Sequence, residues 1–134
     1  MKMLNKNELI CEDINDLKCL IQTDNKGNKY INFNKSDVYC DFDVNLEGVN
    51  LLNANKLYVE GSLIAKNINV ANLDVDNHIK ANYIDVETIA CTTLNCIEIQ
   101  VFENHFIVND VEKGNIEYIR PFHPSDVFDV RSLL

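Results

Sequence analysis

An apolar doublet that recurs about every five residues is the feature that most constrains the fold of this chain. The two members of each doublet stand at positions i and i+2, with a mostly polar residue between them. The doublets are Leu52/Ala54, Leu57/Val59, Leu63/Ala65, Ile68/Val70, Leu73/Val75, Ile79/Ala81, Ile84/Val86, Ile89/Cys91, Leu94/Cys96 and Ile99/Val101. This alternation is typical of β-strands, whose successive side chains point to opposite faces.

The steps between doublets are too short for a series of hairpins. A strand alone takes about 5–6 residues before any turn, and that is the length of a whole step here. Each step must therefore contain a short strand and a corner. A chain that turns the same way at every corner coils into a solenoid with the doublets pointing inward.

Three sides per coil account for the pattern better than four. On a period of about 16 residues the small second members stack, Ala65 over Ala81 near Cys96, whereas a period of about 21 residues mixes Ala with Val. Because packed interiors favour size-matched layers, we predict a short three-sided parallel β-helix, an all-β fold. The last coil is one residue short, and the frequent Asn and Gly at the corners suit tight turns.

The segments that flank the repeat are predicted to cover its exposed edges. We assign residues 1–35 to an N-terminal cap, 36–101 to the solenoid and 102–134 to a C-terminal cap, all in one compact domain. A helix is predicted over residues 8–20. Residues 17–22 and 29–33 are predicted to form a pair of extended segments. Residues 105–109 and 115–120 predict strands around a turn, followed by a short terminal helix that begins at Ser125.

The charge of the chain points to one class of partner. Twenty-one acidic and twelve basic residues give a net charge of -9, which disfavours direct binding of nucleic acid and suits a protein with a basic surface. The same acids also serve solubility. Five cysteines without a CxxC pair fit reduced thiols in a cytoplasm, and no apolar run approaches the ~20 residues of a membrane span.

Outward residues carry whatever specificity the solenoid has. The predicted partner-binding residues are Tyr58, Glu60, Asp74, Asp76, Asp85 and Glu87. Carboxylates on adjacent coils lie ~5 Å apart and repel each other. Their presence is explained either by a basic partner or by chance on a strongly acidic chain.

The sequence predicts no catalytic, cofactor-binding or metal-binding residues, and we expect a protein that is not an enzyme. The histidines His78, His105 and His123 are distant in sequence. Cys91 and Cys96 take inward positions, where a thiol is shielded, and no Walker loop or nucleophile elbow occurs. A remote alternative is a hexapeptide-type acyltransferase, a β-helix enzyme in which His78 would take the catalytic role.

Two stretches resemble known solenoid families. The stretch LYVEGSLIAKNINV, from Leu57 to Val70, resembles the polymer-forming bactofilins, and this likeness implies a self-assembling scaffold or homo-oligomer. Ala71-Asn72-Leu73 is similar to the motif of pentapeptide-repeat proteins, some of which imitate DNA with an acidic solenoid. That likeness implies an acidic inhibitor that occupies a basic groove on a bacterial or phage-targeting nucleic-acid enzyme.

Overall fold

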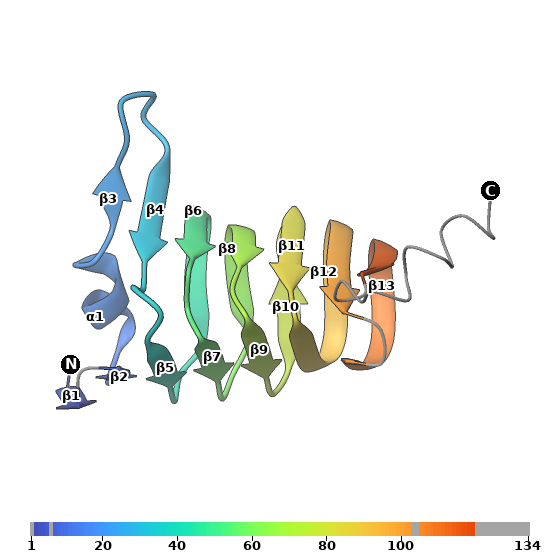
Figure 1. Ribbon diagram of the computed structural model, residues 1–134, viewed down its shortest axis with the longest axis horizontal. Helices are drawn as coiled ribbons and strands as arrows, with labels where there is room; N and C mark the ends of the chain where they lie inside the picture. The colour runs from blue at the N-terminus through green and yellow to red at the C-terminus, as the bar shows by residue number, and fades with distance from the viewer. Residues whose placement is uncertain (1, 6, 103–104, 120–134) are drawn as a thin grey trace, which may run out of the picture.

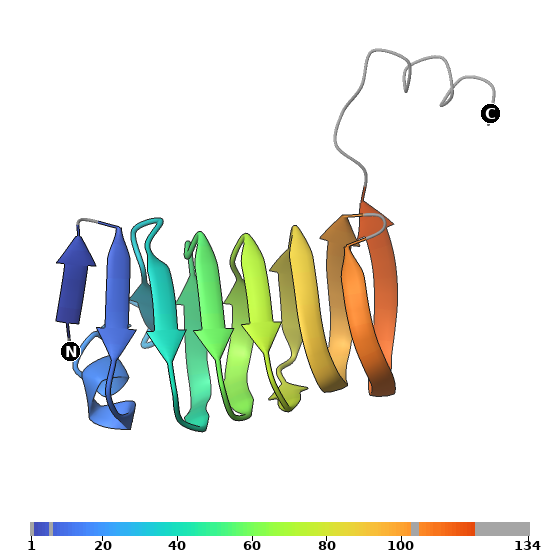
Figure 2. The ribbon, with the colours of Figure 1, turned by 90° about the horizontal axis from the view of Figure 1, so that it is seen from below.

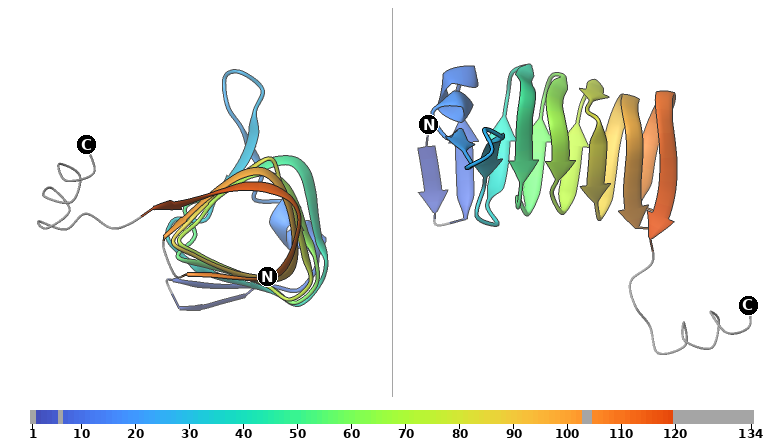
Figure 3. Two further views of the ribbon diagram at one scale, coloured as in Figure 1. Left: turned by 90° about the vertical axis from the view of Figure 1, so that its right-hand side faces the viewer. Right: turned by 90° about the horizontal axis from the view of Figure 1, so that it is seen from above.

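A computed structural model describes residues 2–5, 7–102 and 105–119 as a three-sided parallel β-solenoid. Viewed along its axis the solenoid is a triangle (Figure 3, left), and successive coils stand side by side in Figure 1. Its elements are β1 Lys2–Asn5, β2 Glu8–Cys11, α1 Ile14–Lys18, β3 Gln22–Thr23, β4 Lys29–Asn32, β5 Asp37–Cys40, β6 Val44–Leu52, β7 Lys56–Val59, β8 Leu63–Asn69, β9 Asn72–Val75, β10 His78–Lys80, β11 Tyr83–Val86, β12 Thr88–Phe102 and β13 Phe106–Ile119.

Each side of the triangle is a parallel sheet of strand segments from successive coils (Figure 2), and the first coil contributes strands to sides 1 and 3. Side 1 contains β2, β5, β7, β9 and the first parts of β12 and β13. Side 2 contains the first parts of β6 and β8, then β10 and the middle of β12 and β13. Side 3 contains β4, the ends of β6 and β8, then β11 and the ends of β12 and β13.

The interior is filled by columns of aliphatic side chains, as the doublets predict. Both members of the nine doublets from Leu57/Val59 onward are buried, and burial of each Leu or Ile contributes about 1.5–3 kcal/mol. The first doublet, Leu52/Ala54, was wrong in its first member, whereas Ala54 is buried as predicted. Leu51 points inward between Ile31 and Ile68, and Leu52 is half-buried on the outside, because the next residue, Asn53, turns the corner with a φ of 64°.

The predicted 16-residue period holds in the middle of the chain, where Leu57, Leu73 and Ile89 are stacked in register. The average coil has about 17 residues. Earlier coils are longer because their corners hold more residues, so the hydrogen bond between Asn53 and Asn32 spans 21 positions. The predicted short coil is found where His78 contacts Thr93, 15 positions later.

The N-terminal end is covered by a shorter helix than predicted. Residues 8–11 form β2 and pair in parallel with β5, so the predicted helix over 8–20 begins only at Ile14. The Asp13 side chain caps this helix by accepting from the backbone N of Asn15 at 2.9 Å, and Leu17 is fully buried beneath it. Of the predicted extended pair, 29–33 is found as β4, whereas 17–22 was wrong: it overlaps α1 and shares only Gln22 with β3. Strands β3 and β4 form an antiparallel hairpin, which projects beyond the triangle in Figure 3 (left).

The coils continue past both predicted boundaries of the 36–101 segment. Residues 106–119 do not fold back as a hairpin around 112–115, because Val111 and Ile116 extend the inward columns of Leu94 and Ile99, and β13 pairs with β12 on all three sides. The 102–134 segment therefore begins with a further coil. The 1–35 segment likewise contributes the strands β2 and β4 to the parallel sheets. The helix predicted to begin at Ser125 lies outside the described residues.

Candidate partner-binding surface

Four of the six predicted partner-binding residues lie together on side 1. Tyr58 and Asp74 point outward from β7 and β9, where they occupy the same register position on adjacent coils. Glu60 and Asp76 stand at the corner that follows these strands, and both are exposed. The other two residues lie elsewhere: Asp85 is on β11 in side 3, and Glu87 is at the corner before β12.

The corner between sides 1 and 2 carries one carboxylate on each of four successive coils. The last residues of this side are aligned from coil to coil: Cys11, Cys40, Val59 and Val75. Each is followed in the sequence by an exposed acid, and we call these four the acidic column: Glu12, Asp41, Glu60 and Asp76. Adjacent coils are ~4.8 Å apart, so negative charge accumulates along this edge of the triangle.

Two tyrosines stand beside the acidic column. Tyr39 and Tyr58 are register neighbours on β5 and β7, with ring centroids 6.5 Å apart and ring planes inclined at 55°. Lys56 Nζ lies 5.9 Å from the centroid of each ring, within the range of a cation–π interaction. The surface therefore already holds one alkylammonium group on its aromatic pair.

The phenol of Tyr58 reports the local electrostatic environment. Its Oη donates to Asp76 Oδ2 at 3.5 Å. Loss of solvation, followed by the negative charges of Asp76, Glu60 and Asp74, raises the pKa of Tyr58. An additional negative charge is thus disfavoured here, and a positive charge is favoured.

Sequence reasoning missed Tyr39, Asp41 and Lys56. The signal that could have found the first two is the pair Val38/Cys40, which has the same i, i+2 spacing as the later doublets and is buried in the same way. Extending the repeat upstream to this pair places Tyr39 outward above Tyr58.

Asp85 and Glu87 line a shallow groove of about 430 Å³ at the corner between sides 3 and 1. Lys35 and the amide residues Asn53 and Asn69 line the same groove. This mixture of charges and amides suits a basic partner less well than the acidic column does.

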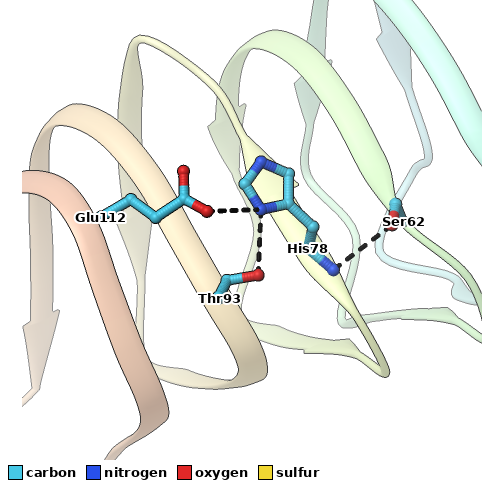
Figure 4. Close-up of polar contacts among 4 residues, drawn as sticks. All are labelled: Ser62, His78, Thr93 and Glu112. Atoms are coloured by element: carbon cyan, nitrogen blue, oxygen red, sulfur yellow. Dashed lines mark hydrogen bonds and ion pairs between the residues drawn. The ribbon is translucent and has the colours of Figure 1, made fainter.

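His78 lies at the corner between sides 1 and 2, on the first position of β10 (Figure 4). Its Nδ1 lies 3.0 Å from Thr93 Oγ1 and 4.0 Å from Glu112 Oε1, and its backbone N donates to Ser62 Oγ at 3.4 Å. A catalytic relay needs the carboxylate and the hydroxyl on opposite ring nitrogens. Here both groups contact the same nitrogen, Nδ1, which does not fit a relay. Ser62, His78, Thr93 and Glu112 instead form a polar ladder along the corner.

Within 2–5, 7–102 and 105–119, no three His, Cys, Asp or Glu side chains gather as metal ligands would. The helix found there, α1, has five residues, and no helix of this part of the chain could cross a bilayer.

The fold defines the chain as a short parallel β-solenoid with an acidic, tyrosine-bearing side. Comparison of the sequence with protein-family models and curated proteins, and of the structure with solved structures, finds no match. The resemblance to bactofilins and pentapeptide-repeat proteins therefore rests on the sequence stretches alone.

Proposed function

We propose that this chain is a protein-binding module without enzymatic activity, and that side 1 binds a basic protein surface. The observation that carries this proposal is that Lys56 Nζ lies 5.9 Å from the centroid of each of two neighbouring tyrosine rings, beside the acidic column. A Lys or Arg side chain of a partner would meet the same combination of aromatic faces and carboxylates.

The spacing of the acidic column suggests which basic surface is the target. One carboxylate per ~4.8 Å coil is close to the linear charge density of a single DNA strand, which carries one phosphate per about 3.4 Å. The solenoid holds its carboxylates on a rigid edge, so little ordering entropy is lost on binding. The proposed partner is a nucleic-acid enzyme whose basic groove the acidic column occupies, which makes the module an acidic inhibitor.

Charge reversal on the acidic column tests this proposal. The variant Glu60→Lys/Asp76→Lys changes the net charge by the same amount as the control Glu47→Lys/Glu98→Lys, whose two residues are exposed at the corner between sides 2 and 3 and on side 3. Each protein is immobilised and exposed to a bacterial lysate, and captured proteins are then challenged with duplex DNA. We expect the wild type and the control to capture a DNA-displaceable protein, and the column variant to lose it.

Salt dependence provides the second readout. Binding between opposite charges weakens steeply as salt shortens the Debye length. Capture that resists both salt and DNA, or that is lost equally in the two double variants, would show that the acidic column is not the binding surface.

A second candidate function, self-assembly, is favoured by the C-terminal end of the solenoid. Among the described residues β13 pairs only with β12, so its other edge has no strand partner there. Tyr118 occupies an inward position in register with the buried Val101, yet it is 55% exposed. At the other end α1 covers the core with Leu17. We therefore propose that two C-terminal ends pair in a closed dimer, a more limited assembly than a bactofilin-like filament.

Two tyrosines that are almost equally exposed test this second candidate. Tyr118→Asp places a charge in the proposed dimer interface, whereas Tyr83→Asp places it on side 3, where Tyr83 is 51% exposed. Light scattering after size exclusion should give a dimer for the wild type and Tyr83→Asp, and a monomer for Tyr118→Asp. A monomeric wild type at all concentrations excludes self-assembly and leaves the binding module untouched.

A further inference from the structure

Two of the five cysteines face each other across adjacent coils at the N-terminal end. Cys11 of β2 and Cys40 of β5 are register partners in parallel strands. Both side chains are only 1% exposed, and their thiols share a hydrogen bond. Adjacent strands lie ~4.8 Å apart, within the range of about 4.4–6.8 Å between Cα atoms that a disulfide spans.

The other cysteines lack such a partner. Cys91 is paired with Val108 on the next coil, and Cys96 belongs to the same strand, β12, as Cys91. Cys19 follows α1 and is exposed, with its thiol directed to the carbonyl of Asp16 at 3.0 Å. Cys11 and Cys40 are thus the one pair of cysteines in register on adjacent strands. They lie where the first coil joins the rest of the solenoid.

We propose that Cys11 and Cys40 form a redox site, in which a small-molecule disulfide such as oxidised glutathione converts the two thiols into an intramolecular disulfide. In the first step one thiolate attacks a sulfur of oxidised glutathione, which breaks that S–S bond and releases one glutathione. In the second step the other cysteine attacks the protein sulfur of the mixed disulfide and releases the second glutathione. Two protein thiols are oxidised, one glutathione disulfide is reduced, and the two thiol protons end on the two glutathiones.

Cys11 is the residue that attacks first. The hydrogen bond from Cys40 lowers the pKa of Cys11, and the same hydrogen bond, together with burial, raises the pKa of Cys40. Cys11 is thus the better thiolate, and Cys40 is the thiol that resolves the mixed disulfide. Because both are buried, reaction with glutathione proceeds through local opening of the outermost coil, the part of a solenoid with the fewest neighbours.

The disulfide would join β2 to β5 and enclose residues 12–39, which contain α1 and the hairpin β3–β4. These elements cover the N-terminal end of the core, so the bond would tie this cover to the second coil. Oxidation therefore reduces opening of the N-terminal end, and reduction restores it. This inference does not depend on the proposed partner.

Oxidation of the full chain with glutathione tests the site. The variant Cys19→Ser removes the exposed thiol, which would otherwise compete as a mixed disulfide. After treatment with oxidised glutathione under native conditions, proteolysis without reduction and mass spectrometry should recover one cross-linked peptide pair that contains Cys11 and Cys40. The yield should fall at least tenfold when Cys40→Ala is added, and remain unchanged when Cys91→Ala is added instead.

Hydrogen exchange gives a readout that does not depend on how the variants fold. In the oxidised Cys19→Ser protein, amides of β2 and α1 should exchange at least tenfold more slowly than in the reduced protein, whereas amides of β11 should be unchanged. Recovery of Cys11 and Cys40 as free thiols, or as separate glutathione adducts, overturns the proposal. So does a cross-link that forms without any change in exchange at β2 and α1.

Discussion

Gly61 lies at the corner before β8, in a position where the space for a side chain is already taken. A Cβ at this residue would overlap Asp43 Oδ1 and would lie 3.0 Å from the Asp43 backbone N. The same Oδ1 accepts a hydrogen bond from the backbone N of Ser62 at 2.8 Å. We therefore predict that Gly61→Ala displaces the Asp43 carboxylate and breaks the link between two coils.

The magnitude follows from two opposing terms. Loss of a hydrogen bond to a charged acceptor costs about 1.5–3 kcal/mol, and replacement of Gly by Ala returns about 0.4–1 kcal/mol through the unfolded state. The φ of Gly61 is not among the positive values found at other corners, so no backbone strain is added. The expected net destabilisation is about 0.5–2.5 kcal/mol.

A double-mutant cycle with Asp43→Ala separates the overlap from other effects. In that background the carboxylate and its hydrogen bond are already gone and only the close approach to the backbone N of residue 43 remains, so Gly61→Ala should cost clearly less than in the wild type. Urea unfolding followed by far-UV circular dichroism measures all four proteins. An equal cost of Gly61→Ala in both backgrounds would refute the reasoning, because it would show that Asp43 does not occupy the space.

Three further predictions concern the core, the thiols and the acidic column. Ala81→Leu should overpack the inward column and cost about 1–3 kcal/mol. Lys80→Ala, at the exposed residue just before it, should change the free energy of unfolding by at most about 0.5 kcal/mol, and thermal melts of the two variants measure both effects. Burial raises the pKa of Cys91 to about 12 from 9.0. Its contribution to stability should therefore be constant below about pH 9 and fall as the pH rises toward 12, because the thiol of the unfolded chain ionises first. The difference between the urea midpoints at about pH 8 and about pH 10.5 should be smaller for Cys91→Ala than for the wild type. Glu60→Asn/Asp76→Asn should raise the free energy of unfolding by about 0.5 kcal/mol at low salt and by less at high salt.

The solenoid could be predicted because its inward positions are chemically uniform. Leu57, Leu73 and Ile89 repeat at one spacing and stack in one column, so a single periodicity specifies both strand and register. The same repeat continues into the flanking segments, where it was not recognised in the sequence. Upstream, longer corners broke the spacing, and downstream the pair Val111 and Ile116 was separated by Gly114, which reads as a hairpin turn.

The proposed binding surface could be predicted only in part because it depends on alignment between coils. Glu60 over Asp76 followed from the 16-residue period, and the structure places both on one corner. Asp41 lies 19 residues before Glu60, so a fixed period could not align it. The separation of Asp85 and Glu87 from this group has another cause: Asp85 is on β11 in side 3, and Glu87 is at the corner between sides 3 and 1, away from the corner that carries the acidic column.

A comparison of two corners of the solenoid shows what the acidic column costs. At the corner between sides 3 and 1, polar side chains bond from coil to coil: Asn55 donates to Asp37 at 2.7 Å, and Thr88 donates to Asn72 at 2.8 Å. Such ladders stabilise a solenoid. At the corner between sides 1 and 2, acids take the equivalent positions, and neighbouring carboxylates about 5 Å apart repel each other by roughly 0.5–1 kcal/mol in water. The fold tolerates amides and hydroxyls at its corners, so it does not require the acids, and a ligand that supplies positive charge would turn their repulsion into binding energy.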